Sequence, residues 1–193
     1  MTINHPPLAT RPGNRKILIT GAGGMLGDAV YTRLSPKYHV TATDKLQIDS
    51  WITALDITDP VAVATLLKKE KYDVIIHLAA LTDLEYCQKN PDEAYKVNTE
   101  SVRQFAEYAR TRNIPFVYLS TACVFDGSKE SYHEYDTPHP INIYGDSKYR
   151  GELIAVRVPK AIIIRAAWMV GGGPNKDKKF FNKIVQQLHK GAS

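Results

Sequence analysis

Short apolar runs alternate with longer amphipathic stretches along most of this sequence. Such alternation is typical of units in which each strand of a parallel sheet is followed by a helix that packs on the sheet. The strand-length runs are almost continuously apolar, which indicates that both faces of the sheet are covered. The pattern predicts an α/β fold: a doubly wound parallel sheet (Rossmann fold) with helices on both faces.

Five runs have the length and composition of strands, and most of the stretches between them show helical spacing of apolar residues. Asp59 and Pro60 are the residue types expected at an N-cap and at a first helical position, so a helix is predicted to begin there. The predicted strands are residues 16–20, 38–43, 73–77, 116–120 and 161–165. The other predicted helices are 25–34, 91–111, 144–156 and 178–189, and residues 126–140 are predicted to be a polar loop.

The length of 193 residues leaves room for one well-buried core but not for two full domains. Residues 1–14 contain three prolines and no apolar core of a signal peptide, so we expect a flexible N-terminal tail followed by one domain over residues 15–193. No apolar run approaches the roughly 20 residues that span a bilayer, so no membrane partner is expected.

The charge and the cysteines exclude further classes of function. Basic residues are dispersed along a chain of net charge +5, which argues against nucleic acid as a principal partner. Cys87 and Cys123 lie far apart, so they form no metal-ligand spacing and no disulfide framework. No metal site is therefore expected, and free cysteines suit a cytoplasmic location. Assembly of the chain into a homo-oligomer stays an open alternative.

A glycine-rich segment, residues 20–27, lies between the first predicted strand and the first predicted helix. Its first glycine permits a tight turn, its second lets the backbone approach a pyrophosphate, and its third lets the helix pack closely on the sheet. The helix N-terminus adds free N–H groups and the positive end of its dipole. In this setting the segment predicts a binding site for NADH or NADPH at Gly21, Gly24, Met25, Leu26 and Gly27.

Asp44 follows the second predicted strand, about 20 residues beyond the glycines. A carboxylate there accepts hydrogen bonds from the ribose hydroxyls of the adenosine and repels a 2′-phosphate. This favours NAD over NADP, although Lys45 beside it weakens the preference. Both cofactors stay candidates.

Tyr144 and Lys148 form a Tyr-x-x-x-Lys pair on one face of a predicted helix. An ammonium near a phenol favours the phenolate and lowers the phenol's pKa, which makes proton exchange with a carbonyl or alcohol oxygen feasible. Thr121, preceded by Ser120 at the end of the fourth predicted strand, supplies a hydroxyl that can hydrogen-bond the reacting oxygen. Thr121, Tyr144 and Lys148 are therefore the predicted catalytic group.

The chain resembles the extended short-chain dehydrogenases/reductases, most closely the dTDP-4-dehydrorhamnose reductase family. The similarity covers almost everything after the tail. The segments that carry it are TGAGGMLG (20–27), LDITDP (55–60), DVIIHLAALT (73–82), AYKVN (94–98), LSTACVFDG (119–127), PINIYGDSK (140–148) and IIRAAWMVG (163–171).

The resemblance implies NAD(P)H-dependent reduction of the 4-keto group of a nucleotide-linked deoxysugar, as in dTDP-rhamnose biosynthesis. Tyr144 would give the proton to the oxygen, supported by Thr121 and Lys148. Lys148 would also hold the nicotinamide ribose. The same match implies further binding residues: Asp56 and Ile57 facing the adenine, Leu78, Ala79 and Ala80 lining the dinucleotide, and Ser120 and Trp168 contacting the substrate.

The chain departs from the family in two ways. Ala122 and Cys123 stand where the family usually has aspartate and tyrosine, which affects substrate contacts. Family members also continue into a C-terminal lobe that grips the sugar nucleotide, and this lobe is expected to be largely absent here. Two other functions stay open: a sugar-nucleotide epimerase, and a non-catalytic dinucleotide-binding or regulatory domain such as the regulatory subunit of methionine adenosyltransferase.

Several residues with reactive side chains are assigned structural roles instead. His77 ends an apolar run and is predicted to be a packed strand residue. Arg165 suits an ion pair as well as a phosphate contact. Asp83 and Glu85 are predicted to lie in a solvated loop.

Overall fold

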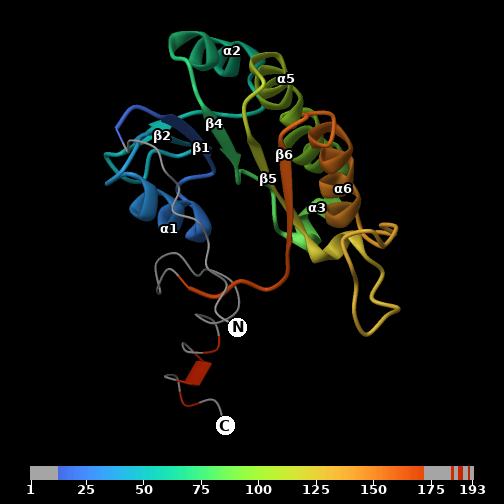
Figure 1. Ribbon diagram of the computed structural model, residues 1–193. Helices are drawn as coiled ribbons and strands as arrows, with labels where there is room; N and C mark the ends of the chain where they lie inside the picture. The colour runs from blue at the N-terminus through green and yellow to red at the C-terminus, as the bar shows by residue number, and fades with distance from the viewer. Residues whose placement is uncertain (1–12, 172–183, 185–186, 189–190, 192–193) are drawn as a thin grey trace, which may run out of the picture.

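The computed structural model describes residues 13–171 together with 184, 187, 188 and 191. Its centre is a six-stranded parallel sheet in the order β3-β2-β1-β4-β5-β6, which confirms the doubly wound fold (Figure 1). The order reverses between β1 and β4, and ligands of such sheets bind at the carboxyl ends of the strands beside this point. The strands are β1 (Lys16–Thr20), β2 (His39–Asp44), β3 (Ile52–Ala54), β4 (Val74–His77), β5 (Phe116–Thr121) and β6 (Ala161–Ala166).

Helices lie on both faces of the sheet, with α1 on one and α2, α5 and α6 on the other (Figure 1). The α-helices are α1 (Met25–Leu34), α2 (Pro60–Lys69), α3 (Leu84–Lys89), α4 (Pro91–Tyr95), α5 (Val102–Arg112) and α6 (Ile143–Ala155). A π-helix, η1 (Lys96–Glu100), joins α4 to α5, and a 3-10 turn, η2 (Ala122–Val124), follows β5.

Alternation along β1 builds the two halves of the core. Ile17 and Ile19 point to the α1 side, whereas Leu18 between them points to the other side. There Leu18 joins a larger cluster that contains Phe105 of α5 and Phe116 of β5, all with no exposed surface. Burying each such side chain stabilises the fold by about 1.5–3 kcal/mol, so this cluster anchors β5 and α6, the elements that carry the predicted catalytic group.

The expectation that both faces are covered is correct only for part of the sheet. On β6, Ile163 packs against the larger cluster, but Ile162 and Ile164 on the opposite face are 53% and 46% exposed within the described part of the chain. The described residues leave that side of the edge strand in contact with solvent.

The structure corrects three local predictions. β3 was missed because three residues are too short to show alternation. The segment after β4 was predicted to be a loop, but Asp83 accepts a hydrogen bond from the backbone N–H of Tyr86 and caps helix α3. The helical run predicted over 91–111 has the right extent but is not regular, because η1 interrupts it. Most of the predicted tail and of the predicted helix 178–189 lies outside the described residues.

Candidate functional site

The glycine loop between β1 and α1 owes two of its glycines to packing. Gly21 has a φ of 73°, and a Cβ there would lie 2.5 Å from the backbone nitrogen of Ala79. A Cβ on Gly27 would lie 2.2 Å from the carbonyl oxygen of Gly21. At Gly24 the nearest atom would be 3.4 Å away, so the protein itself leaves room for a side chain. The missing Cβ at Gly24 therefore leaves open space in front of the loop, as close approach of a pyrophosphate requires.

The N-terminus of α1 is the second feature that fits a phosphate group. Side chains of Asp59, Asp83 and Asn142 cap helices α2, α3 and α6 by accepting hydrogen bonds from first-turn N–H groups. Helix α1 begins at Met25 without any side-chain cap. Its first N–H groups, at Met25 and Leu26, are thus available to an anion and lie at the positive end of the helix dipole.

Asp44 lies beside this loop, where the sequence placed it. One carboxylate oxygen accepts a hydrogen bond of 3.0 Å from the backbone N–H of Gly23. Lys45 turns away and forms an ion pair of 3.3 Å with Asp56. Burial acts to raise the pKa of Asp56, but hydrogen bonds from Thr58 and the charge of Lys45 hold it below its ordinary value.

The segment after β4 lies against the glycine loop. The N–H of Leu78 donates to the carbonyl oxygen of Thr20 at 3.1 Å, and the N–H of Ala79 donates to the Thr20 hydroxyl at 3.4 Å. Leu78 also packs on the α1-side core, while Ile57 packs on the core of the other face. The structure thus brings residues 78–80 to the edge of the sheet where the glycine loop lies.

Asn98, in η1, is a buried residue that the sequence analysis missed. Its amide oxygen accepts from the N–H of Leu81 at 2.8 Å, and its amide nitrogen donates to the carbonyl oxygen of Leu81 at 2.9 Å. The same nitrogen lies 3.0 Å from the hydroxyl of Ser147 on α6. Asn98 therefore ties the segment after β4 to the helix with the predicted catalytic residues. An uncharged polar residue within a predicted amphipathic helix was the signal that could have revealed it.

Thr121 ends β5, and its side chain acts on the pKa of the Tyr144 phenol. The Thr121 hydroxyl accepts from the N–H of Cys123 at 3.1 Å. Burial raises the pKa of the Tyr144 phenol, while a hydrogen bond with Thr121 acts to lower it. The expectation that Lys148 lowers this pKa is wrong in this structure, because burial outweighs the lowering influence and the Lys148 ammonium lies against another residue, Tyr118.

Lys148 is almost completely buried, and its Nζ lies 4.3 Å from the centre of the Tyr118 ring. Burial lowers the pKa of Lys148 to about 7, and the charge of Glu152 acts in the opposite direction. Both oxygens of Glu152 accept from Arg165, at 3.0 Å and 2.8 Å. Of the two roles considered for Arg165, the structure shows the ion pair.

His77 is confirmed as a packed strand residue. It is completely buried, and its Nδ1 lies 2.9 Å from the Thr20 hydroxyl. Burial, with help from the charge of Lys148, lowers the pKa of His77 to about 3, so the ring is neutral at physiological pH.

The two predicted substrate contacts differ in exposure. Ser120 is buried, and its hydroxyl has no hydrogen-bond partner among the described residues. Such an unpaired buried hydroxyl near the predicted catalytic group fits a site that a bound molecule completes. Trp168 follows β6 and is 84% exposed.

The described residues contain neither a membrane-spanning helix nor a metal-binding cluster. No helix there has the length and apolar character to cross a membrane. No group of three or more histidine, cysteine, aspartate or glutamate side chains is arranged to hold a metal ion.

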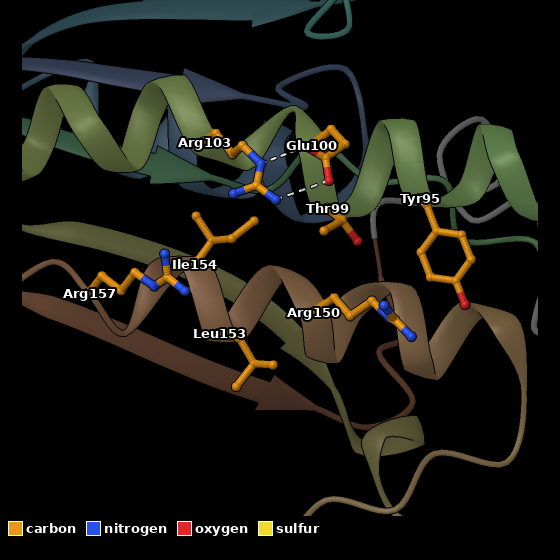
Figure 2. Close-up of a pocket in the computed structure, with 8 residues that line it drawn as sticks. All are labelled: Tyr95, Thr99, Glu100, Arg103, Arg150, Leu153, Ile154 and Arg157. Atoms are coloured by element: carbon orange, nitrogen blue, oxygen red, sulfur yellow. Dashed lines mark hydrogen bonds and ion pairs between the residues drawn. The ribbon is translucent and has the colours of Figure 1, made fainter.

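A hollow of about 380 Å³ lies away from this site, between the helical run 91–112 and α6 (Figure 2). Three arginines line it, and two of them form ion pairs: Arg103 with Glu100, and Arg150 with Asp146. The predicted chemistry therefore lies at the strand ends and not in this hollow.

The chain is similar in sequence to a known protein family and to several of its members. A model of the RmlD substrate binding domain matches residues 15–192. The dTDP-4-dehydrorhamnose reductase of Aggregatibacter actinomycetemcomitans is 38% identical over 175 residues, which cover 89% of this chain and 57% of that protein. Methionine adenosyltransferase 2 subunit beta of Xenopus laevis is 32% identical over 160 residues, which cover 82% of this chain and 48% of that protein.

A solved structure of a dTDP-4-dehydrorhamnose reductase is also similar to this chain. The dTDP-4-dehydrorhamnose reductase of Bacillus anthracis, crystallised with NADP, superposes with a TM-score of 0.81 and 34% identity. The superposition covers 93% of this chain and 61% of that one. The chain thus spans about half the length of the curated relatives it matches.

Proposed function

Because the chain belongs to the RmlD substrate binding domain family, we propose that it is the dinucleotide-binding part of an NAD(P)H-dependent reductase. Its reaction is reduction of the 4-keto group of a nucleotide-linked deoxysugar. One observation carries the proposal: Thr121 ends β5 and acts on the pKa of the Tyr144 phenol, and Lys148 is buried on the same helix as Tyr144. Two similar reductases, from Aggregatibacter actinomycetemcomitans and Bacillus anthracis, support it.

The glycine loop and its surroundings bind the cofactor in this proposal. The open face at Gly24 and the uncapped N-terminus of α1 hold the pyrophosphate, and Asp44 accepts from the ribose hydroxyls. The adenine faces Asp56 and Ile57 in this proposal, and the dinucleotide is lined by residues 78–80. When bound, the reduced nicotinamide supplies the hydride that the carbonyl carbon receives.

Tyr144 supplies the proton. As the carbon–oxygen double bond becomes a single bond, the oxygen takes the phenol's proton and forms the alcohol. Thr121 hydrogen-bonds the same phenol oxygen, which favours the phenolate left behind. Lys148, buried on the same helix, is proposed to hold the nicotinamide ribose. Ser120 and Trp168 are proposed to contact the sugar nucleotide.

The Asp44 carboxylate repels a 2′-phosphate, whereas the similar reductase of Bacillus anthracis was crystallised with NADP, so both NADH and NADPH are proposed as cofactors. Neither cysteine forms a disulfide, which supports a reducing compartment, and we place the protein in the cytoplasm.

The test follows NADH and NADPH fluorescence, first on adding the protein and then on adding a dTDP-4-keto-6-deoxysugar. We expect enhancement on binding, and then a decay that requires the sugar and is lost in Tyr144→Phe. Tyr149→Phe is the matched control, because it removes a second phenol from the same helix and should retain turnover. Absence of enhancement with either cofactor, in folded protein, would refute cofactor binding.

A second candidate is a cofactor-binding subunit that does not itself turn over a sugar. The 32% identity to methionine adenosyltransferase 2 subunit beta of Xenopus laevis favours it. Enhancement without decay, unchanged when the protein is extended to the length of its relatives, would select this alternative over the reductase.

A further inference from the structure

Tyr118, on β5, is the residue whose ring faces the Lys148 ammonium. The ring is completely buried among the apolar side chains of the larger core cluster, beside Phe116 on the same face of the strand. Nζ of Lys148 lies 4.3 Å from its centre. This is within the range at which the negative face of an aromatic ring attracts a cation, and the attraction is strongest where water is excluded.

The other groups near Lys148 explain why the ring matters. His77, on β4, stacks on the Tyr118 ring with 5.9 Å between ring centres, and it is neutral. Glu152, on α6, carries the opposite charge but is already bound through both oxygens to Arg165. Tyr144, on α6, is an uncharged phenol. The ring face of Tyr118 therefore adds attraction to the buried ammonium, which among the described residues is balanced by the shared carboxylate of Glu152.

The Tyr118 hydroxyl fixes the ring in this place. It lies 3.2 Å from the carbonyl oxygen of Asn98 and 3.3 Å from that of Lys148. A phenol carries one proton, so it donates to one of them at a time. Gly151 makes room for it, since a Cβ there would lie 2.1 Å from the hydroxyl oxygen. Burial raises the pKa of Tyr118 well above 10, so the group stays a neutral phenol that can donate.

We propose that Tyr118 is a positioning residue for Lys148: its ring holds the ammonium in place and keeps it charged. The role of Lys148 in holding the cofactor rests on the proposed function, whereas the contact between ring and ammonium does not. Because the pKa of Lys148 is about 7, with burial lowering it against the opposing charge of Glu152, a loss of attraction from the ring changes the charge of Lys148 in the physiological range.

The experiment measures the titration of Lys148 directly, without cofactor or substrate. Lysine labelled with ¹³C at Cε is observed by NMR from pH 5 to 11, and the Lys148 signal is assigned by its loss in Lys148→Met. Tyr118 is then replaced in turn by phenylalanine and by phenylalanine with one, two or three ring fluorines. The fluorines weaken the negative charge on the ring face but keep the shape of the ring. We expect Tyr118→Phe to titrate close to the wild type, and the trifluorinated ring to lower the midpoint by about one pH unit.

A matched truncation separates a positioning role from a merely structural one. Tyr118→Leu removes the ring, whereas Phe116→Leu makes the same kind of cavity two residues away on the same face. We expect only Tyr118→Leu to lower the midpoint. Equal midpoints across the fluorinated series, or equal shifts in both leucine variants, would overturn the proposal.

The fluorinated series keeps the test valid if Tyr118→Leu fails to fold. The same series also separates this proposal from the proposed function. If the wild type reduces a keto sugar, the high-pH limb of kcat/KM should move down together with the NMR midpoint. A graded NMR midpoint without any turnover would support the ring contact and count against the reductase.

Discussion

Replacing Lys148 with methionine tests the burial of the ammonium through the stability of the fold. Methionine fills a similar volume and carries no charge, so the change removes a buried cation and little packing. The ordinary lysine pKa of 10.5 applies to the unfolded chain, and burial lowers it to about 7 in the folded protein. Between these two values the unfolded chain holds a proton that the folded chain has released. Folding therefore becomes more favourable as pH rises through this window.

The two pKa values set the size of the effect. One pKa unit corresponds to about 1.36 kcal/mol, so the gap between 10.5 and about 7 corresponds to about 5 kcal/mol. This cost is present in full below pH 7, falls to about 2 kcal/mol near pH 9, and is gone above pH 10.5. The free energy of unfolding of Lys148→Met should thus exceed that of the wild type most at pH 6, and the excess should shrink by several kcal/mol towards pH 10.

The measurement is urea unfolding followed by far-UV circular dichroism at pH 6, 7, 8, 9 and 10. Taking the difference between the two proteins at each pH removes the titration of every other group. Lys71→Met is the control: this lysine is exposed, so the corresponding difference should not vary with pH. A difference for Lys148→Met that stays constant from pH 6 to 10 would refute the depressed pKa and, with it, the charge balance described for the site.

Four further predictions concern two loop glycines, the choice of cofactor and a helix end. Gly24→Ala should change the free energy of unfolding by less than about 1 kcal/mol, because the nearest atom to a new Cβ is 3.4 Å away, yet weaken NADH binding about tenfold or more in a fluorescence titration. Gly27→Ala should lower the free energy of unfolding by about 3 kcal/mol or more, since its Cβ would lie 2.2 Å from a backbone oxygen; equal behaviour of the two variants would contradict the packing argument. Asp44→Asn should raise the affinity for NADPH relative to NADH about tenfold by removing a like charge, and an unchanged ratio of dissociation constants would exclude Asp44 as the discriminating residue. Asp59→Ala should cost about 1 kcal/mol in urea unfolding, because its carboxylate accepts from two first-turn N–H groups of α2, while Asp59→Ser should lose less.

The parts of the fold that rest on local signals were predicted closely. Helix α1 begins at Met25 and ends at Leu34 as expected, because a glycine turn precedes it and its apolar residues repeat with helical spacing. Asp59 and Pro60 begin α2 as expected, since capping depends on atoms within a few residues. Strand β3 was missed because its pairing depends on β2, which supplies its hydrogen-bond partners. The π-helix η1 was missed because hydrogen bonds to residues far away in the sequence stabilise it. Asn98 in this helix bonds to Leu81 and to Ser147.

The sequence by itself determined the order of the elements apart from β3 and α3, and it predicted the glycine loop and the candidates Thr121, Tyr144 and Lys148, because backbone turns and periodic apolar residues are local properties. The tertiary structure decided where the Lys148 ammonium lies. Tyr118 is 30 residues away along the chain, and it comes into contact only when β5 packs beneath α6. Burial and neighbouring charges set a pKa, and both depend on residues far apart in sequence. The pattern Tyr-x-x-x-Lys therefore predicted which residues are candidates for the site, and the folded core determined their electrostatic environment.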